Sequence, residues 1–194
     1  MIIAIKESER VVFGYTNRQA MTNLSLKDYV DDENVPMGFF ENGCAFSFVT
    51  MNRQSDLFRY DEEFLKMEPT PKTIVREMLP YIKKKLRDVG AITDEGVWKN
   101  ALVISDGERI YGIDRELNFY EVDDYTTHSF TTDQITSCLD ATEDWPAEKR
   151  IIAAVSFVEE LRGEKLFPLI IMDTKDKEKK YVYGGESSEH SLSL

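Results

Sequence analysis

Cysteine, histidine and long apolar runs are scarce in this sequence. Only 2 cysteines (Cys44 and Cys138) and 2 histidines occur in 194 residues, and neither kind has the spacing of a metal site or a disulfide framework. We therefore expect no metal, cofactor or disulfide. No apolar run approaches the roughly 20 residues that cross a bilayer, so no membrane partner is expected. The first residues lack the basic segment and cleavage site of a signal peptide, which predicts a cytoplasmic protein.

Basic residues are outnumbered. Lys and Arg total 24 against 36 Asp and Glu, which gives a net charge of −12. Such a surface repels phosphate groups, so we expect no nucleic-acid partner. The charge is interpreted as a solubility feature, with a basic patch on a protein partner as the alternative.

Glycine (10 residues) and proline (6 residues) are also few, and 42% of the residues are apolar. This composition is typical of a globular protein. We predict a single domain over residues 1–185, because the length is short for two domains. A flexible, Ser-rich tail is predicted at 186–194.

The first 50 residues predict two β-hairpins. Apolar runs at 2–6 and 11–15 flank a polar turn, and those at 37–40 and 44–50 flank an Asn-Gly turn. The polar segment between the hairpins includes the acidic run 31–34, which we expect to be an exposed loop.

A long helix follows. Thr70 is a good N-cap and Pro71 a good first residue, and apolar residues then recur at helical spacing until Gly90. Pro80 lies inside this pattern and should kink or split the helix, because it cannot donate a backbone hydrogen bond.

The second half of the chain predicts short strands, then two helices, then a last hairpin. The strands are expected at 101–105, 109–113 and 119–122, the helices at 133–141 and 146–161, and the hairpin at 168–173 and 181–184. Because most strands are joined by short turns, a doubly wound parallel sheet is excluded. We predict an α+β fold: a four-layer αββα sandwich with two antiparallel sheets between helix layers.

This order of elements resembles the proteasome β-subunit family of N-terminal-nucleophile (Ntn) hydrolases. The stretch 101–114 (ALVISDGERIYGID) is similar to a strand, Asp-Gly turn, strand and charged turn of that family. The helix 146–161 with the strand 167–173 resembles the family's last helix and the strand after it. The hairpin that ends at 14–18 resembles a strand that typically ends Ala-Ala-Asp-Ser-Arg. The resemblance covers residues 2–184 and implies a homo-oligomer.

The family's chemistry has definite requirements. A Thr, Ser or Cys must be the first residue, so that its α-amine acts as the base, and a Lys, an Asp and a Gly-Ser-Gly stretch assist. The matching positions here carry Ile2 for the nucleophile, Thr16 for the Asp and 35–36 (Val-Pro) for the Lys. The segment around Ser129 lacks glycine, and only Arg18 is retained. The resemblance therefore implies a protein without the family's catalytic residues.

These observations favour a non-catalytic protein that acts through self-assembly or through binding a partner. One alternative is an amide or peptide hydrolase of the same fold with a displaced nucleophile such as Cys44, which the pattern places as a buried strand residue. Another alternative is a regulatory or ligand-binding module. Fold alone does not decide between them.

Other residues are less suggestive. His128 lies beside Ser129 and 123–124 (Asp-Asp), but residues so close in the chain do not converge as a Ser-His-Asp triad, so we predict a loop histidine. His190 falls in the tail. The acidic runs 31–33 and 123–124 lack the ligand pattern of a calcium loop and are expected to be solvated. The aromatic residues of the later strands are predicted to pack in the core: Tyr111, Phe119, Tyr120 and Tyr125.

Overall fold

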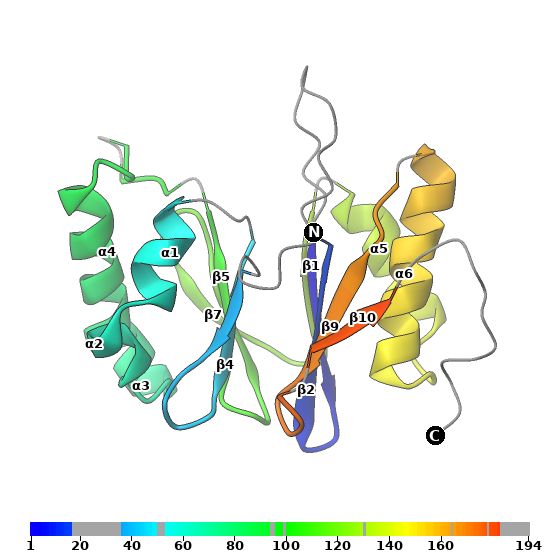
Figure 1. The fold of residues 1–194 in the computed structure, drawn as a ribbon, viewed down its shortest axis with the longest axis horizontal. Helices are drawn as coiled ribbons and strands as arrows, with labels where there is room; N and C mark the ends of the chain where they lie inside the picture. Colours follow the sequence, from blue (N-terminus) through cyan, green and yellow to red (C-terminus); the bar gives the residue numbers. More distant parts are fainter. Residues whose placement is uncertain are drawn as a thin grey trace.

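Two antiparallel five-stranded sheets pack face to face, with helices on both outer faces (Figure 1). The computed structural model describes residues 1–16, 36–49, 53–93, 96–98, 100–129, 131–163, 165–177 and 179–182. This arrangement confirms the predicted αββα sandwich. Predictions for the acidic run 31–34, Arg18, Val35 and the tail with His190 fall outside the described residues.

The first sheet, here called sheet A, has the strand order β10-β9-β2-β1-β8. The opening hairpin is confirmed, because Ile2 of β1 pairs with Tyr15 of β2. On its other side β1 pairs with β8, where Ile2 lies opposite His128. The strands of sheet A are β1 (Ile2–Glu7), β2 (Arg10–Thr16), β8 (Tyr125–His128), β9 (Leu169–Asp173) and β10 (Lys179–Val182).

The second sheet, sheet B, has the order β3-β4-β5-β6-β7. Each neighbour in this sheet is also the next strand in the chain. The connections are short except the one between β4 and β5, which contains a long helical segment. The strands of sheet B are β3 (Met37–Phe39), β4 (Ala45–Phe48), β5 (Leu102–Ser105), β6 (Ile110–Ile113) and β7 (Phe119–Val122).

One helical layer covers sheet B. It consists of α1 (Arg53–Arg59), α2 (Glu62–Leu65), α3 (Pro71–Thr73), the π-helical turn η2 (Ile74–Met78) and α4 (Leu79–Asp88). The helical run is not interrupted at Pro80, which lies in α4 after the π-helical turn η2. The backbone N–H of Leu79 donates to the carbonyl of Ile74, a wider turn that precedes the proline. The short helices α1 and α2 were not predicted.

The other helical layer, on sheet A, is the pair α5 (Thr132–Ala141) and α6 (Ala147–Arg162). Helix α6 lies so close to β2 that a Cβ at Gly14 would be 2.3 Å from Cγ2 of Ile151. Glycine at this point is what permits the close approach of helix and sheet. None of the helices among the described residues is long and apolar enough to cross a membrane.

Three apolar clusters fill the sandwich, and strand alternation divides the residues among them. On β2, Phe13 faces sheet B while Val12 faces α6, and both are fully buried. A third cluster, rich in phenylalanine and containing Trp98, lies between sheet B and its helices. The central cluster joins the two sheets, so the relative position of the sheets is fixed by packing.

Candidate functional site

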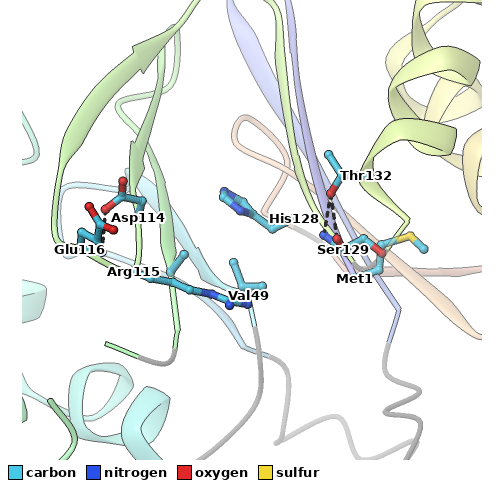
Figure 2. A pocket seen from close by; sticks show the side chains of 9 residues that line it. Met1, Val49, Asp114, Arg115, Glu116, His128, Ser129 and Thr132 are labelled. Carbon is cyan, nitrogen blue, oxygen red and sulfur yellow. Dashed lines mark hydrogen bonds between the residues drawn. The ribbon is translucent and has the colours of Figure 1, made fainter. Parts of the chain in front are cut away.

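A pocket of about 460 Å³ opens at the end of the sandwich where β1 begins (Figure 2). One wall comes from sheet A and the start of α5, and the facing wall comes from the β6–β7 turn of sheet B. The lining residues are Met1, Val49, Ala101, Asp114, Arg115, Glu116, His128, Ser129 and Thr132.

The start of β1 brings Met1, rather than Ile2, to the pocket. The side chain of Ile2 is fully buried in the cluster between the sheets, and alternation turns Met1 the other way. With Met1 as the first residue, burial lowers the pKa of its α-amino group to about 6. The Met1 side chain packs against the apolar cluster between sheet A and its helices. Among the described residues, the end of β1 therefore presents no hydroxyl or thiol at the pocket.

Thr16 ends β2 next to this point. Its backbone N–H donates to the carbonyl oxygen of Met1 (3.2 Å). The side chain is 2% exposed, and its hydroxyl has no hydrogen-bond partner among the described residues. Thr16 thus helps to position Met1 through its backbone, while its side chain is not among those that line the pocket.

His128 lies at the end of β8 and points between the two walls (Figure 2). Its Nε2 is 3.3 Å from the hydroxyl of Tyr120 on β7. The Tyr120 ring in turn lies directly over Gly112, where an added Cβ would be 2.1 Å from the ring. Burial lowers the pKa of His128, and the nearby Arg115 guanidinium lowers it further, so the imidazole is neutral at pH 7.

Hydroxyl groups lie on the sheet A wall, between β8 and α5. The Ser129 hydroxyl is 3.0 Å from that of Thr131, and the backbone N–H of Ser129 donates to the hydroxyl of Thr132 (3.3 Å). The Thr132 hydroxyl donates to the Ser129 carbonyl (2.8 Å). This network holds Ser129 through its own turn, and no hydrogen bond joins its hydroxyl to His128 among the described residues.

The opposite wall is the β6–β7 turn. Asp114 organises it by accepting hydrogen bonds from the backbone N–H groups of Glu116 (2.8 Å) and Asn118 (2.9 Å). Although burial alone would raise the pKa of Asp114, these hydrogen bonds hold it below the usual range. The Arg115 carbonyl accepts from the backbone N–H of buried Trp98 (2.7 Å), which ties the turn to the helical side of sheet B. The Arg115 side chain is left to extend into the pocket (Figure 2).

Cys44 is not part of the pocket. It lies before β4, which runs from Ala45 to Phe48, whereas the pocket residue Val49 follows that strand. Cys44 was predicted to be a buried residue within a strand. Both parts of this prediction are wrong, because Cys44 is partly exposed and precedes the strand. Its pKa is raised by burial and then by the negative charge of Asp106.

The structure brings together only part of what the sequence suggested. Ser129 lines the pocket and Thr16 lies beside it, but Cys44 is elsewhere. The prediction that His128 is a loop residue is wrong, because it is paired with β1. Its acidic neighbours do not approach it: Asp124, at the other end of β8, forms an ion pair with Arg150 (3.3 Å).

Within the described part of the chain, no cluster of His, Cys, Asp and Glu could hold a metal ion.

Arg115 was missed by the sequence reasoning, as were the other residues of its turn. The charged turn at 114–118 was recognised, but a charged turn is usually a solvated connection. Its role becomes visible only when the sandwich places it opposite Ser129 and Thr132.

Many solved structures are similar to this chain, and BPH, Anbu and HslV proteins are among them. BPH from Thiobacillus denitrificans, in complex with epoxomicin, matches with a TM-score of 0.71 and 11% identity over 89% of this chain and 96% of its own. Anbu (ancestral beta-subunit) from Yersinia bercovieri matches with a TM-score of 0.64 and 14% identity over 96% of this chain and 88% of its own. Eukaryotic HslV from Trypanosoma brucei matches with a TM-score of 0.63 and 13% identity over 89% of this chain and 97% of its own.

No family model matches the sequence. No curated protein matches it either. At the identities found, the likeness to solved structures concerns the fold alone.

Proposed function

We propose that this chain, which has the proteasome-like Ntn-hydrolase fold, is a non-catalytic subunit that acts by binding a ligand in its pocket and by self-assembly. One observation carries the proposal: Met1 lines the pocket and Ile2 is buried in the core, so β1 offers no nucleophile there. What remains is a concave site in which Met1, Val49 and Ala101 lie beside polar groups on two facing walls, and such concave sites are where small ligands bind.

The chemistry explains why this observation matters. In the Ntn mechanism the nucleophilic oxygen or sulfur and the α-amine that activates it belong to one residue, and they must both face the scissile bond. The α-amine is buried at the pocket and its pKa is lowered to about 6, which would suit a base. A hydroxyl or thiol on the same residue is what β1 does not supply.

Epoxomicin provides a direct test, since the Thiobacillus BPH structure contains it. The purified chain is incubated with epoxomicin, and its intact mass is measured, with the Thiobacillus protein as the positive control. We expect the mass of this chain to remain unchanged. A stoichiometric adduct that maps to a pocket residue would contradict the proposal. A Ser129→Ala variant would then show whether Ser129 is the modified residue.

The alternative, a hydrolase with Cys44 as a displaced nucleophile, has less support. Its raised pKa disfavours the thiolate, and the pocket imidazole lies beyond the other end of β4. No observation on the described residues places a base beside it.

Self-assembly rests on the resemblance to β-subunits. We expect native mass spectrometry to show a defined multiple of the chain mass. A monomer at all accessible concentrations would contradict this part of the proposal and leave the binding role in place.

The cytoplasmic location, a protein partner and the absence of a nucleic-acid partner remain expectations from composition.

A further inference from the structure

The Arg115 guanidinium extends into the pocket without a counter-ion. No carboxylate among the described residues lies within ion-pair distance of it. Four other arginines each have a carboxylate partner: Arg10, Arg59, Arg109 and Arg150. Arg76 and Arg87 also have no ion pair among the described residues, but they are exposed helix residues outside the pocket lining. What distinguishes Arg115 is its position in the pocket lining, where its guanidinium has the geometry to pair with a bound carboxylate.

The acidic residues beside Arg115 do not neutralise it. Asp114 accepts hydrogen bonds from Glu116 and from both the backbone and the side chain of Asn118 (3.0 Å for the latter), so its charge is used inside its own turn. Glu116 lines the pocket without pairing with Arg115. These two negative charges limit how much more negative charge the pocket can accept. A singly charged anion therefore meets less repulsion here than a phosphate dianion does.

The facing wall offers groups of the right kind. Ser129 and Thr132 place two hydroxyl oxygens across from Arg115 (Figure 2). The Thr132 hydroxyl donates to the Ser129 carbonyl, so toward a ligand it can act only as an acceptor. Thr132 is also the first residue of the ten-residue helix α5, so the positive end of the helix dipole adds to the favourable potential. His128 lies between the walls as a neutral ring that can donate or accept one hydrogen bond.

From these groups we propose that the pocket binds a small monocarboxylate, whose carboxylate pairs with Arg115 while the rest of the molecule contacts the Ser129 and Thr132 wall. A volume of about 460 Å³ is sufficient for a molecule of the size of an acylated amino acid. This inference rests on the binding role proposed above and names the chemistry of the ligand.

His128 provides a reporter at the site. The chain has only 2 histidines, so in a His190→Gln variant all histidine signals in NMR spectra come from His128. The probes are N-acetyl-leucine and its uncharged amide, which have nearly the same shape. We expect N-acetyl-leucine to shift the His128 signals saturably and to raise the pKa of His128, because it neutralises the Arg115 charge that contributes to lowering that pKa. We expect the amide to leave both unchanged.

Two matched variants complete the test. Arg115→Gln should weaken binding of N-acetyl-leucine about tenfold or more, because a charge-assisted hydrogen bond is lost. Arg109→Gln, in the β5–β6 turn outside the pocket lining, should leave it unchanged. Equal binding of the amide, no saturable shift with N-acetyl-leucine, an unaffected Arg115→Gln variant or a stronger response to inorganic phosphate would each overturn the inference. None of these outcomes would create an epoxomicin adduct, so failure of the ligand class and failure of the non-catalytic proposal are separable.

Discussion

At the scale of single residues, Cys44 illustrates how position decides the chemistry of a side chain. Cys44 and the pocket residue Val49 are five positions apart in extended chain, roughly 16 Å. Burial and the charge of Asp106 raise its pKa, so at neutral pH it is a thiol. A cysteine that attacks a carbonyl requires the opposite, a lowered pKa beside a cation or a base.

We predict that Cys44 reacts slowly with iodoacetamide. In a Cys138→Ser variant, where Cys44 is the only thiol, alkylation at pH 7.5 should be slower in the folded protein than in the same protein unfolded in urea. The reason is the smaller thiolate fraction in the folded state. Mass spectrometry over time measures both rates. Faster alkylation of the folded protein would show an activated thiol and would revive the displaced-nucleophile alternative.

At the scale of elements, helix α6 depends on a side chain from the opening hairpin. Its N-cap residue Pro146 makes no side-chain cap, and the carboxylate of Glu7 instead accepts a hydrogen bond from the backbone N–H of Ala147 (2.8 Å). Glu7 also pairs with Arg10, which pairs with Asp173 of β9. This cluster ties the helix start to three strands of sheet A.

We predict that Glu7→Gln lowers the free energy of unfolding by about 1 kcal/mol at pH 7, since a carboxylate at a helix N-terminus is lost. The hydrogen bonds from Ala147 and Arg10 outweigh the effect of burial and lower the pKa of Glu7 below its ordinary value of 4.5. Because the pKa of Glu7 is lower in the folded protein than in the unfolded chain, ionised Glu7 stabilises the folded state at pH values above its unfolded pKa. This stabilisation is lost as the pH falls through the folded pKa.

Urea unfolding at pH 7, 5.5 and 4 measures the effect of Glu7→Gln. The difference from the unmodified protein should therefore shrink on acidification. Glu9→Gln is the control, because Glu9 is exposed and forms only a surface pair with Lys175 (3.2 Å). A difference that grows as the pH falls would contradict the assignment.

The elements that the sequence predicted are those with strong local signals. The hairpins around the Asn-Gly and Asp-Gly turns, the helix that begins at Thr70 and the last two helices all appear in the structure. Strand β8 (Tyr125–His128) was missed, because its four residues are mostly polar and follow two aspartates. Its strand conformation depends on pairing with β1, a contact between distant parts of the chain. Helix α1 carries no clear start signal and is held by packing of Phe58 against the sheet B cluster.

At the scale of the whole molecule, the central cluster makes the two sheets depend on each other. Phe13 of sheet A and Val103 of sheet B are both fully buried in it. Trp98 lies in the separate cluster on the far side of sheet B, whereas Trp145 is 52% exposed before α6. Fluorescence from Trp98 therefore reports on a region that Phe13 does not contact.

We predict that Phe13→Ala destabilises the whole fold by about 3–5 kcal/mol. In a Trp145→Phe background, Trp98 fluorescence and far-UV circular dichroism should shift together to lower urea, because a single domain unfolds in one transition. Two separate transitions, with Trp98 unaffected, would mean that sheet B and its helices unfold independently. That outcome would contradict the predicted single domain over residues 1–185.

The candidate site was less accessible from the sequence than the fold. Ser129 and Thr16 were selected because they match motif positions, but Arg115 and Thr132 carry no motif. They come from turns about 17 positions apart in the chain and meet only because β7 belongs to sheet B and β8 to sheet A. A pocket formed by two edges of different sheets has no periodicity that a single sequence could reveal.

Gly112 has a consequence for any future redesign of the pocket. It is outside the pocket lining, yet the space above its hydrogen atom is where the Tyr120 ring rests, and that phenol contacts the His128 imidazole. A methyl group added at Gly112 would displace the Tyr120 phenol. Because that phenol contacts the His128 imidazole, the substitution would also change the surroundings of His128. Ligand binding in this pocket is therefore open to adjustment by a substitution at Gly112, which leaves the lining residues unchanged.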